Sequence, residues 1–130
     1  MDLDFTLPAL SDLRARAQRR LPDFAFEYLD SATGTEAGAD RNRAGLDRVG
    51  FMPSILAGQF EPKLSTHFLG QDWSLPLGIA PIGMSGMIWP DAERILARKA
   101  AALQLVFGLS TVSASTPEAV GPLTDGRGWF

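Results

Sequence analysis

LGIAP at residues 77–81 and VFGLS at residues 106–110 are the two stretches that decide the fold. Each is a short apolar run without polar alternation, which is typical of a strand buried on both faces of a parallel sheet. Trp129-Phe130 predicts the start of a third strand. Between the strands, the sequence predicts one helix that begins at Pro90 and another that begins at Thr116-Pro117, where a cap residue precedes a first-turn proline.

Strands that alternate with helices at this spacing indicate parallel β/α units, in which right-handed crossovers place successive strands side by side. The sequence therefore predicts an α/β fold, but doubly wound sheets and closed barrels both begin in this way. The helix after Pro90 is expected to turn one stripe toward the sheet, with Lys99 contributing at most its aliphatic stem. The expected members of this stripe are Ala92, Ile95, Leu96, Lys99, Ala102 and Leu103.

Three helices are predicted in the first third of the chain. The first is expected to have Ser11 as its cap. One face of it is expected to carry Leu10, Leu13, Ala17 and Leu21. The second begins at Pro22 and ends near Gly34, because proline suits a first turn and glycine a helix end. A third, polar helix is predicted over residues 36–48.

A hairpin is predicted after an irregular segment, residues 51–62. Its strands are residues 64–69 and 71–75, joined around Gly70. His67 lies in this hairpin and is interpreted as an exposed polar residue without a nearby carboxylate in the sequence.

Composition excludes several classes of protein. The 130 residues are 45% hydrophobic, enough for a packed core, and the net charge of -3 without a basic cluster argues against a nucleic-acid partner. With no cysteine and one histidine, neither a disulfide nor a metal motif that needs two histidines is available. The uncharged stretches 73–90 and 100–117 are interpreted as buried strand plus loop, and the start lacks a signal-peptide pattern, so a cytoplasmic location is expected.

Ligands of parallel β/α proteins bind at the carboxyl ends of the strands. Here those ends are residues 81–86 and 110–113. The first segment has two glycines and no charge, which suits a flat, mostly apolar ring better than a naked phosphate. It equally suits a tight strand-to-helix connection that needs glycine for its dihedral angles. The standard glycine-rich nucleotide fingerprints are absent from the sequence.

Two single side chains have both a structural and a functional interpretation. Ser110 comes at the end of a predicted strand. It can be interpreted as a polar residue that ends the strand or as a hydroxyl that donates a hydrogen bond to a ligand. Tyr28 shares a helix face with Phe24. It can be interpreted as an amphipathic core residue or as a phenol that reaches into a pocket. The residues alone leave both alternatives open.

Four motifs in order resemble the FMN-dependent α-hydroxy-acid oxidase/dehydrogenase family, which includes glycolate oxidase, the flavin L-lactate dehydrogenases and mandelate dehydrogenase. They are LPDFAFEYLDSATG, NRAGLDRVGFMPSIL, LPLGIAPIGMSGMIWPDAE and GLSTVSASTPEAV. The resemblance implies a (β/α)8 TIM barrel preceded by helices and a hairpin. Residues 1–76 would form that prelude and residues 77–130 the first β/α units. It also implies FMN as cofactor and oxidation of an L-2-hydroxy acid to a 2-oxo acid.

The resemblance implies roles for particular residues. Tyr28 matches the tyrosine that binds the substrate carboxylate, and Ser110 matches a serine that contacts FMN. Pro81, Ile82 and Gly83 match the segment whose backbone packs against the flavin ring. Glycine at 83, where many oxidases of the family have alanine, favours a dehydrogenase that passes electrons to a quinone or another carrier rather than to oxygen. Val112 replaces a bulky aromatic residue of glycolate oxidase, so the smallest substrates are not assured.

The family's histidine base, arginine clamp, flavin lysine and phosphate-binding segment have no counterpart in these residues, and a barrel takes roughly 250 residues. No catalytic residue is therefore assigned. One hypothesis is the N-terminal portion of an enzyme; the alternative is a non-catalytic remnant, or half of a split barrel that needs a partner chain. The resemblance also implies a homo-oligomer at full length, and peripheral attachment to the inner membrane as an alternative location.

The 130-residue chain by itself is predicted to be poorly soluble or molten and not to hold FMN. The reason is that two or three parallel strands leave unpaired edges and a half-covered apolar face. Thermal unfolding and flavin absorbance of the purified chain measure this. A soluble monomer that unfolds cooperatively with stoichiometric flavin would contradict it.

Overall fold

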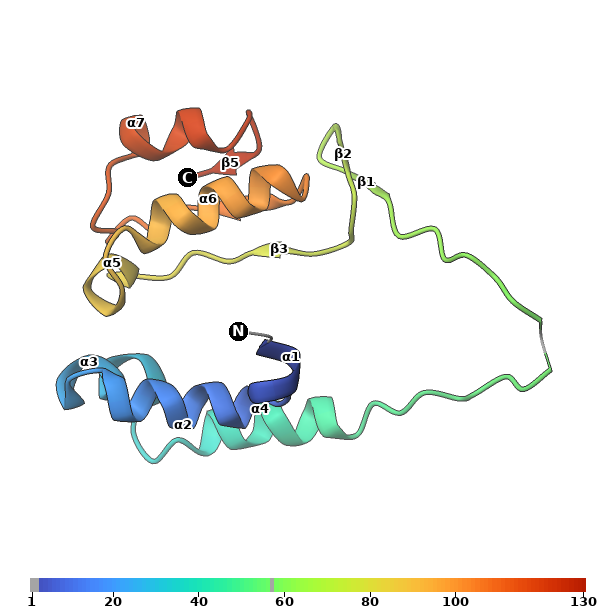
Figure 1. Ribbon diagram of the computed structural model, residues 1–130, viewed down its shortest axis with the longest axis horizontal. Coiled ribbons are helices and arrows are strands. Elements are labelled where there is room, and N and C mark those ends of the chain that lie inside the picture. The colour runs from blue at the N-terminus through green and yellow to red at the C-terminus, as the bar shows by residue number, and fades with distance from the viewer. Residues whose placement is uncertain (1–2, 57) are drawn as a thin grey trace. The chain divides into compact units, whose positions relative to one another are not determined.

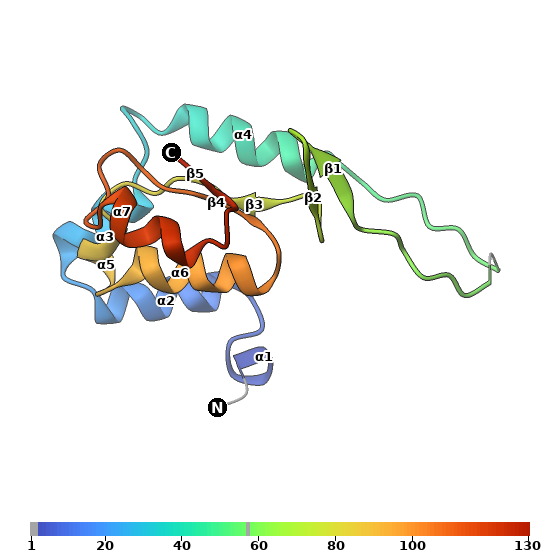
Figure 2. The same ribbon diagram turned by 90° about the horizontal axis from the view of Figure 1, so that it is seen from above.

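The structure is a computed structural model that describes residues 3–56 and 58–130. The chain divides into two compact units: a helical unit up to Phe60 and a sheet unit, Glu61–Phe130. Figures 1 and 2 together label the helices and strands, and each unit is described by itself. Among the described residues, no helix combines the length and the apolar character needed to cross a membrane.

The helical unit contains α1 (Leu3–Thr6), α2 (Leu10–Arg20), α3 (Asp23–Asp30) and α4 (Ala37–Asp47). The predicted Ser11 cap is wrong by two residues: Ala9 is the cap, and its N–H donates to Asp12 Oδ2 over 3.1 Å. Pro22 is the N-cap of α3 rather than its first residue, and the helix ends at Asp30 with Ser31 as its C-cap, so Gly34 does not directly follow the helix. The predicted polar helix is confirmed as α4, none of whose residues is buried.

An ion pair connects helices α2 and α3. The guanidinium of Arg14 donates to both carboxylate oxygens of Asp30, each over 2.6 Å, and lies 5.7 Å from the centre of the Phe26 ring. The hydrogen bond from Arg14 lowers the pKa of Asp30. Ala25 and Phe26 form the buried face of α3. The predicted apolar face of α2 is only partly covered, since Ala17 and Leu21 are half-buried and Leu10 and Leu13 are exposed.

The sheet unit confirms the predicted parallel β/α arrangement. Strands β3 (Gly78–Ile79), β4 (Val106–Gly108) and β5 (Gly128–Trp129) are parallel in that order, with Gly78 beside Val106 and Gly108 beside Trp129. The connections carry α5 (Ser85–Ile88), α6 (Ala92–Ala102), α7 (Pro117–Val120) and the 3-10 turn Gly121–Leu123. Figures 1 and 2 show α6 and α7 on the same face of this sheet. Thr116 caps α7 as predicted, its Oγ1 accepting the N–H of Ala119.

The core of the sheet unit lies between β4 and the helices. Phe107 and Leu109 pack with Ala97, Ala100 and Val120, and all five side chains are buried. The predicted stripe of α6 is confirmed only at Leu96, which packs half-buried against this core. The fully buried residues of the helix are Glu93, Ala97 and Ala100, and Ala92 is half-buried. The remaining predicted members, Ile95, Lys99, Ala102 and Leu103, are exposed. The helix is rotated by about one residue, roughly 100°. The small side chains of Ala97 and Ala100 allow the helix to pack closely against Phe107. The prediction placed only apolar residues and a lysine stem on the buried face, so it did not include the buried Glu93.

The predicted hairpin is confirmed as β1 (Thr66–Phe68) and β2 (Gln71–Trp73), with positive φ at Leu69 and Gly70 in the turn. Trp73 is 4% exposed, and its ring and that of Phe68 lie 6.2 and 6.1 Å from the ring of Trp129. The contacts thus group the hairpin with the strands, whereas the sequence analysis assigned it to the prelude, residues 1–76.

Phe107→Ala is predicted to lower the free energy of unfolding by about 3–5 kcal/mol, because truncation of a buried phenylalanine leaves a cavity. Chemical denaturation of the protein at its full natural length measures the change. Val112→Ala, at a side chain 59% exposed, is the control. An equal effect of the two substitutions would contradict the assigned core.

Candidate functional site

Two loops follow the strands at their carboxyl ends. The first strand-end loop (residues 80–90) follows β3, and the second strand-end loop (residues 109–116) follows β4. Pro81 lies so close to Gly108 that a Cβ at Gly108 would be 2.8 Å from the Pro81 Cδ, a distance real side chains do not adopt. Further along, the N–H of Met84 donates to the carbonyl of Val112 over 3.0 Å. The structure therefore brings the predicted residues Pro81–Gly83 and Ser110 to one edge of the sheet.

The surface of these loops is uncharged, since neither contains an acidic or basic residue. Pro81 and Ile82 are exposed, whereas Gly83 and Ser110 are half-buried. The Ser110 Oγ accepts the N–H of Val112 over 3.2 Å, which leaves its hydroxyl proton able to donate. A pocket of about 320 Å³ borders Pro81 on the sheet. It is lined by Gly78, Ile79, Ala80, Pro81, Val106, Gly108, Leu109, Trp129 and Phe130.

Tyr28 lies in α3 and belongs to the helical unit, whereas the other predicted site residues belong to the sheet unit. Its side chain is 44% exposed, and the buried residues of that helix are Ala25 and Phe26. Tyr28 is therefore not a fully buried core residue, which was its structural interpretation.

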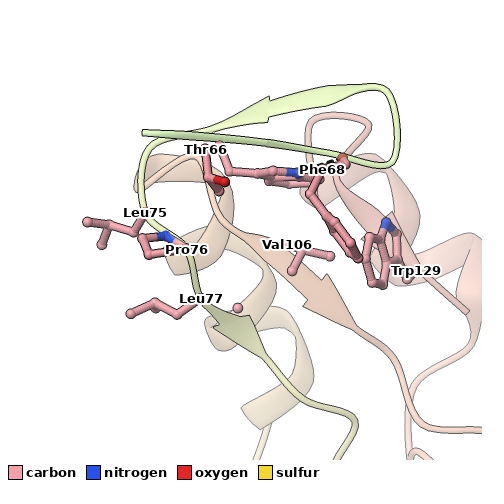
Figure 3. A pocket seen from close by; sticks show the side chains of 9 residues that line it. Thr66, Phe68, Leu75, Pro76, Leu77, Val106 and Trp129 are labelled. Atoms are coloured by element: carbon pink, nitrogen blue, oxygen red, sulfur yellow. Dashed lines mark hydrogen bonds between the residues drawn. The ribbon is translucent and has the colours of Figure 1, made fainter. Parts of the chain in front are cut away.

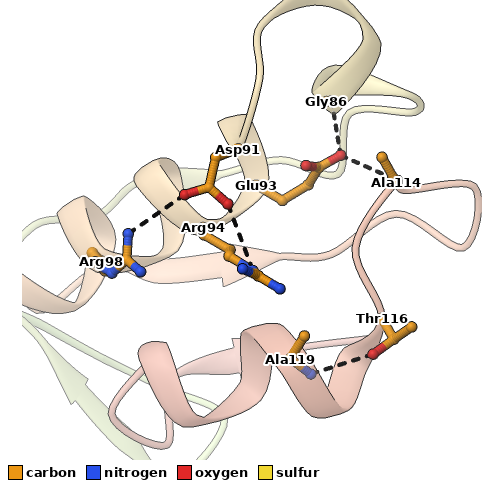
Figure 4. Close-up of polar contacts among 8 residues, drawn as sticks. All are labelled: Gly86, Asp91, Glu93, Arg94, Arg98, Ala114, Thr116 and Ala119. Carbon is orange, nitrogen blue, oxygen red and sulfur yellow. Dashed lines mark hydrogen bonds and ion pairs between the residues drawn. The ribbon is translucent and has the colours of Figure 1, made fainter.

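Glu93 joins the two strand-end loops and was missed by the sequence analysis. It is 2% exposed, and its Oε1 accepts the N–H of Gly86 over 2.9 Å and that of Ala114 over 3.1 Å (Figure 4). Burial acts to raise the pKa of Glu93, but hydrogen bonds from its own backbone, Ala114 and Gly86 together hold that pKa below 4.5. The sequence does show a glutamate in the first turn of the helix, but such a residue is usually interpreted as solvent-exposed and as stabilising the helix dipole.

The loops approach each other closely at Gly86. A Cβ on this residue would be 2.7 Å from the Ala114 Cβ and 2.9 Å from the Glu93 Oε2. Close backbone approach, rather than a special dihedral angle, is therefore what requires glycine here.

His67 has a partner that the sequence analysis did not foresee. Its Nδ1 lies 2.7 Å from Asp72 Oδ1, because the hairpin register sets the two residues opposite each other. The interpretation without a nearby carboxylate is wrong, although both side chains are exposed. Among the described residues, no group of three or more acidic, histidine or cysteine side chains could hold a metal ion.

A second apolar pocket, of about 340 Å³, lies at the other end of the strands, under the hairpin. Figure 3 shows Val106 pointing toward the hairpin, beside the rings of Phe68 and Trp129. Because ligands of parallel β/α proteins bind at carboxyl strand ends, the strand-end loops are the candidate site.

Residues 17–130 match the sequence profile of the family described as FMN-dependent dehydrogenase. The chain belongs to this FMN-dependent dehydrogenase family. It is 39% identical over 124 residues to an L-lactate dehydrogenase of Ectopseudomonas mendocina (strain ymp), covering 95% of this chain and 33% of that protein. An L-lactate dehydrogenase of Xanthomonas euvesicatoria pv. vesicatoria (strain 85-10) is 38% identical, with 95% and 32% covered. The chain spans about a third of the length of these relatives.

Solved structures agree with this membership. The chain is similar to a soluble mutant of the membrane-associated (S)-mandelate dehydrogenase from Pseudomonas putida, with a TM-score of 0.87, 35% identity, and 95% of this chain and 36% of that chain covered. It is also similar to a mandelate oxidase, with a TM-score of 0.84, 30% identity, and 94% and 35% covered. The predicted resemblance to flavin-dependent hydroxy-acid oxidases and dehydrogenases is therefore confirmed.

FMN is the cofactor of this family. The strand-end loops fit its ring system, because they offer an uncharged surface, exposed Pro81 and Ile82, and a hydroxyl donor at Ser110. They offer no cation for its phosphate.

Glu93→Gln is predicted to make protein stability less dependent on acidic pH. Because the folded pKa is lowered, the ionised carboxylate stabilises the fold fully above about pH 4.5, and this contribution is lost as pH falls through the folded pKa. Melting temperatures of the full-length protein between neutral and acidic pH measure it, with the exposed Glu27→Gln as the charge control. Parallel curves for wild type and Glu93→Gln would contradict the assignment.

Proposed function

We propose that the protein, at its full natural length, oxidises an L-2-hydroxy acid to a 2-oxo acid with FMN. The observation that carries this proposal is the uncharged, closely joined pair of strand-end loops in a chain of the FMN-dependent dehydrogenase family. The relatives named L-lactate dehydrogenase and mandelate dehydrogenase support the class of substrate.

The three parallel strands are, in this proposal, the first strands of a (β/α)8 barrel, with residues 1–76 as its prelude and 77–130 as its first units. Support comes from the strand order β3-β4-β5 and from helices on one sheet face. Barrel closure would pair the strand edges and fill the other face.

Each proposed role is the one that the family resemblance implies for that residue. The backbone of Pro81–Gly83 would pack against the flavin ring, and the hydroxyl of Ser110 would donate a hydrogen bond to FMN. The phenol of Tyr28 would donate to the substrate carboxylate. When bound, FMN supplies the site that accepts two electrons from the substrate. His67 is not proposed as the base, because it lies in the hairpin rather than on the strand-end loops.

The electron acceptor proposed is a quinone or another carrier, with oxygen as the alternative. Glycine at position 83 and the dehydrogenase names of the relatives favour the carrier. The membrane-associated mandelate dehydrogenase supports a location peripheral to a membrane, beside the cytoplasmic one.

Anaerobic flavin reduction tests the activity. The full-length protein is loaded with FMN and mixed with L-lactate or (S)-mandelate, and bleaching of the visible flavin absorbance is followed, with the opposite enantiomers as controls. Bleaching by an L-acid alone is expected. Bound FMN that no 2-hydroxy acid reduces would favour the non-catalytic alternative, and failure to bind FMN would overturn the proposal.

Ser110→Ala and Tyr28→Phe are predicted to have separable effects. Loss of one hydroxyl hydrogen bond at Ser110 should weaken FMN binding roughly tenfold, whereas Tyr28→Phe should raise KM for the hydroxy acid roughly tenfold and leave FMN affinity unchanged. Flavin fluorescence titration and steady-state kinetics measure the two quantities, and each variant is the control for the other. The same pattern in both variants would contradict the assigned roles.

A further inference from the structure

One buried carboxylate, that of Glu93, connects the two strand-end loops. Its Oε1 accepts an N–H from each loop, at Gly86 and at Ala114. Gly86 follows Gly83 by three residues, and Ala114 follows Ser110 by four. The carboxylate is therefore bonded to the same two short segments that carry the proposed flavin contacts.

Packing alone does not account for a glutamate at this position. Burial of a carboxylate is unfavourable unless hydrogen bonds compensate for the lost water. Here Oε1 accepts the N–H groups of Gly86 and Ala114, and the backbone of Glu93 and the side chain of Ser85 also act to lower the pKa of the carboxyl group. A residue that only filled space between α6 and the loops would be apolar, so the charge serves the two N–H groups.

A second hydrogen bond also connects the two loops, and the loops are closely packed where Glu93 binds them. The hydrogen bond from Met84 to Val112 joins the same loops directly, and Gly86 leaves no room for a Cβ between Ala114 and Glu93. Glu93 projects from the first turn of α6, whose Ala97 and Ala100 are fixed in the core. The core thus sets where both loops lie.

We propose that Glu93 is a positioning residue for FMN: by holding Gly86 and Ala114 on one oxygen, it fixes the spacing between the Pro81–Gly83 backbone and Ser110. This inference rests on the proposed function, since it assigns both segments to the flavin. It adds a residue that need not touch the cofactor.

Glu93→Gln in the full-length protein tests the proposal, because glutamine keeps the shape and one acceptor oxygen but removes the charge. Amide hydrogen exchange in residues 82–88 and 111–116 should become at least about tenfold faster, with the hairpin unchanged. The dissociation constant for FMN should rise at least about tenfold, and the visible circular dichroism of the bound flavin should change. Glu27→Gln, at an exposed helical glutamate of the helical unit, is the control and should match wild type within about twofold.

The outcomes separate this inference from the proposed function. Faster exchange confined to the two loops, together with weaker FMN binding, supports it. Unchanged loop exchange overturns it, as does loosening of the loops with normal FMN affinity and spectrum. Uniformly faster exchange would show a general structural role and overturn it too. If wild type binds no FMN, the proposed function fails and the inference with it, whereas normal FMN binding by Glu93→Gln removes the inference alone.

Discussion

The packing of Phe107 and Leu109 of the β4 segment against Ala97 and Ala100 of α6 is the interaction on which the sheet unit depends. Side chains of a strand alternate between its two faces, so this packing directs the next residue, Ser110, to the face away from the helices. The same packing fixes α6, and with it the first-turn Glu93. Hydrophobic burial on one face thus determines where the polar groups of the strand-end loops lie.

Local patterns in the sequence predict the elements of the sheet unit well. The apolar runs around Ile79 and Phe107, the turn at Gly70 and the cap at Thr116 each contain the physical cause of the structure that forms. Parallel order follows from the helices between the strands, because a short turn cannot make that crossover. The segments around Pro81–Gly83 and Ser110 are equally compatible with a tight strand-to-helix connection, and their flavin-binding role stays a prediction that the family resemblance implies.

Features that depend on distant contacts are the ones the sequence does not reveal. Burial of Glu93 depends on N–H groups seven and 21 residues away, so a pattern that places apolar residues inside gives the wrong face of α6. The His67–Asp72 pair depends on hairpin register, which spacing along the chain does not show. The predicted cap at Ser11 fails because Asp12 bonds back to the N–H of Ala9, an equally local alternative.

The sheet face that α6 and α7 do not cover contains two glycines at which no side chain fits. A Cβ at Gly78 would clash with Val106, and a Cβ at Gly108 would clash with Pro81. The pocket under the hairpin and the pocket beside Pro81 are both lined by Gly78 and Val106. At the amino ends, Phe68, Trp73 and Trp129 cover this face with aromatic rings. At the carboxyl ends, the strand-end loops carry the exposed Pro81 and Ile82 and the hydroxyl of Ser110. An apolar surface with a hydroxyl nearby suits a flat ring with polar edges, and for this reason we propose the strand-end loops, rather than the pocket under the hairpin, as the FMN site.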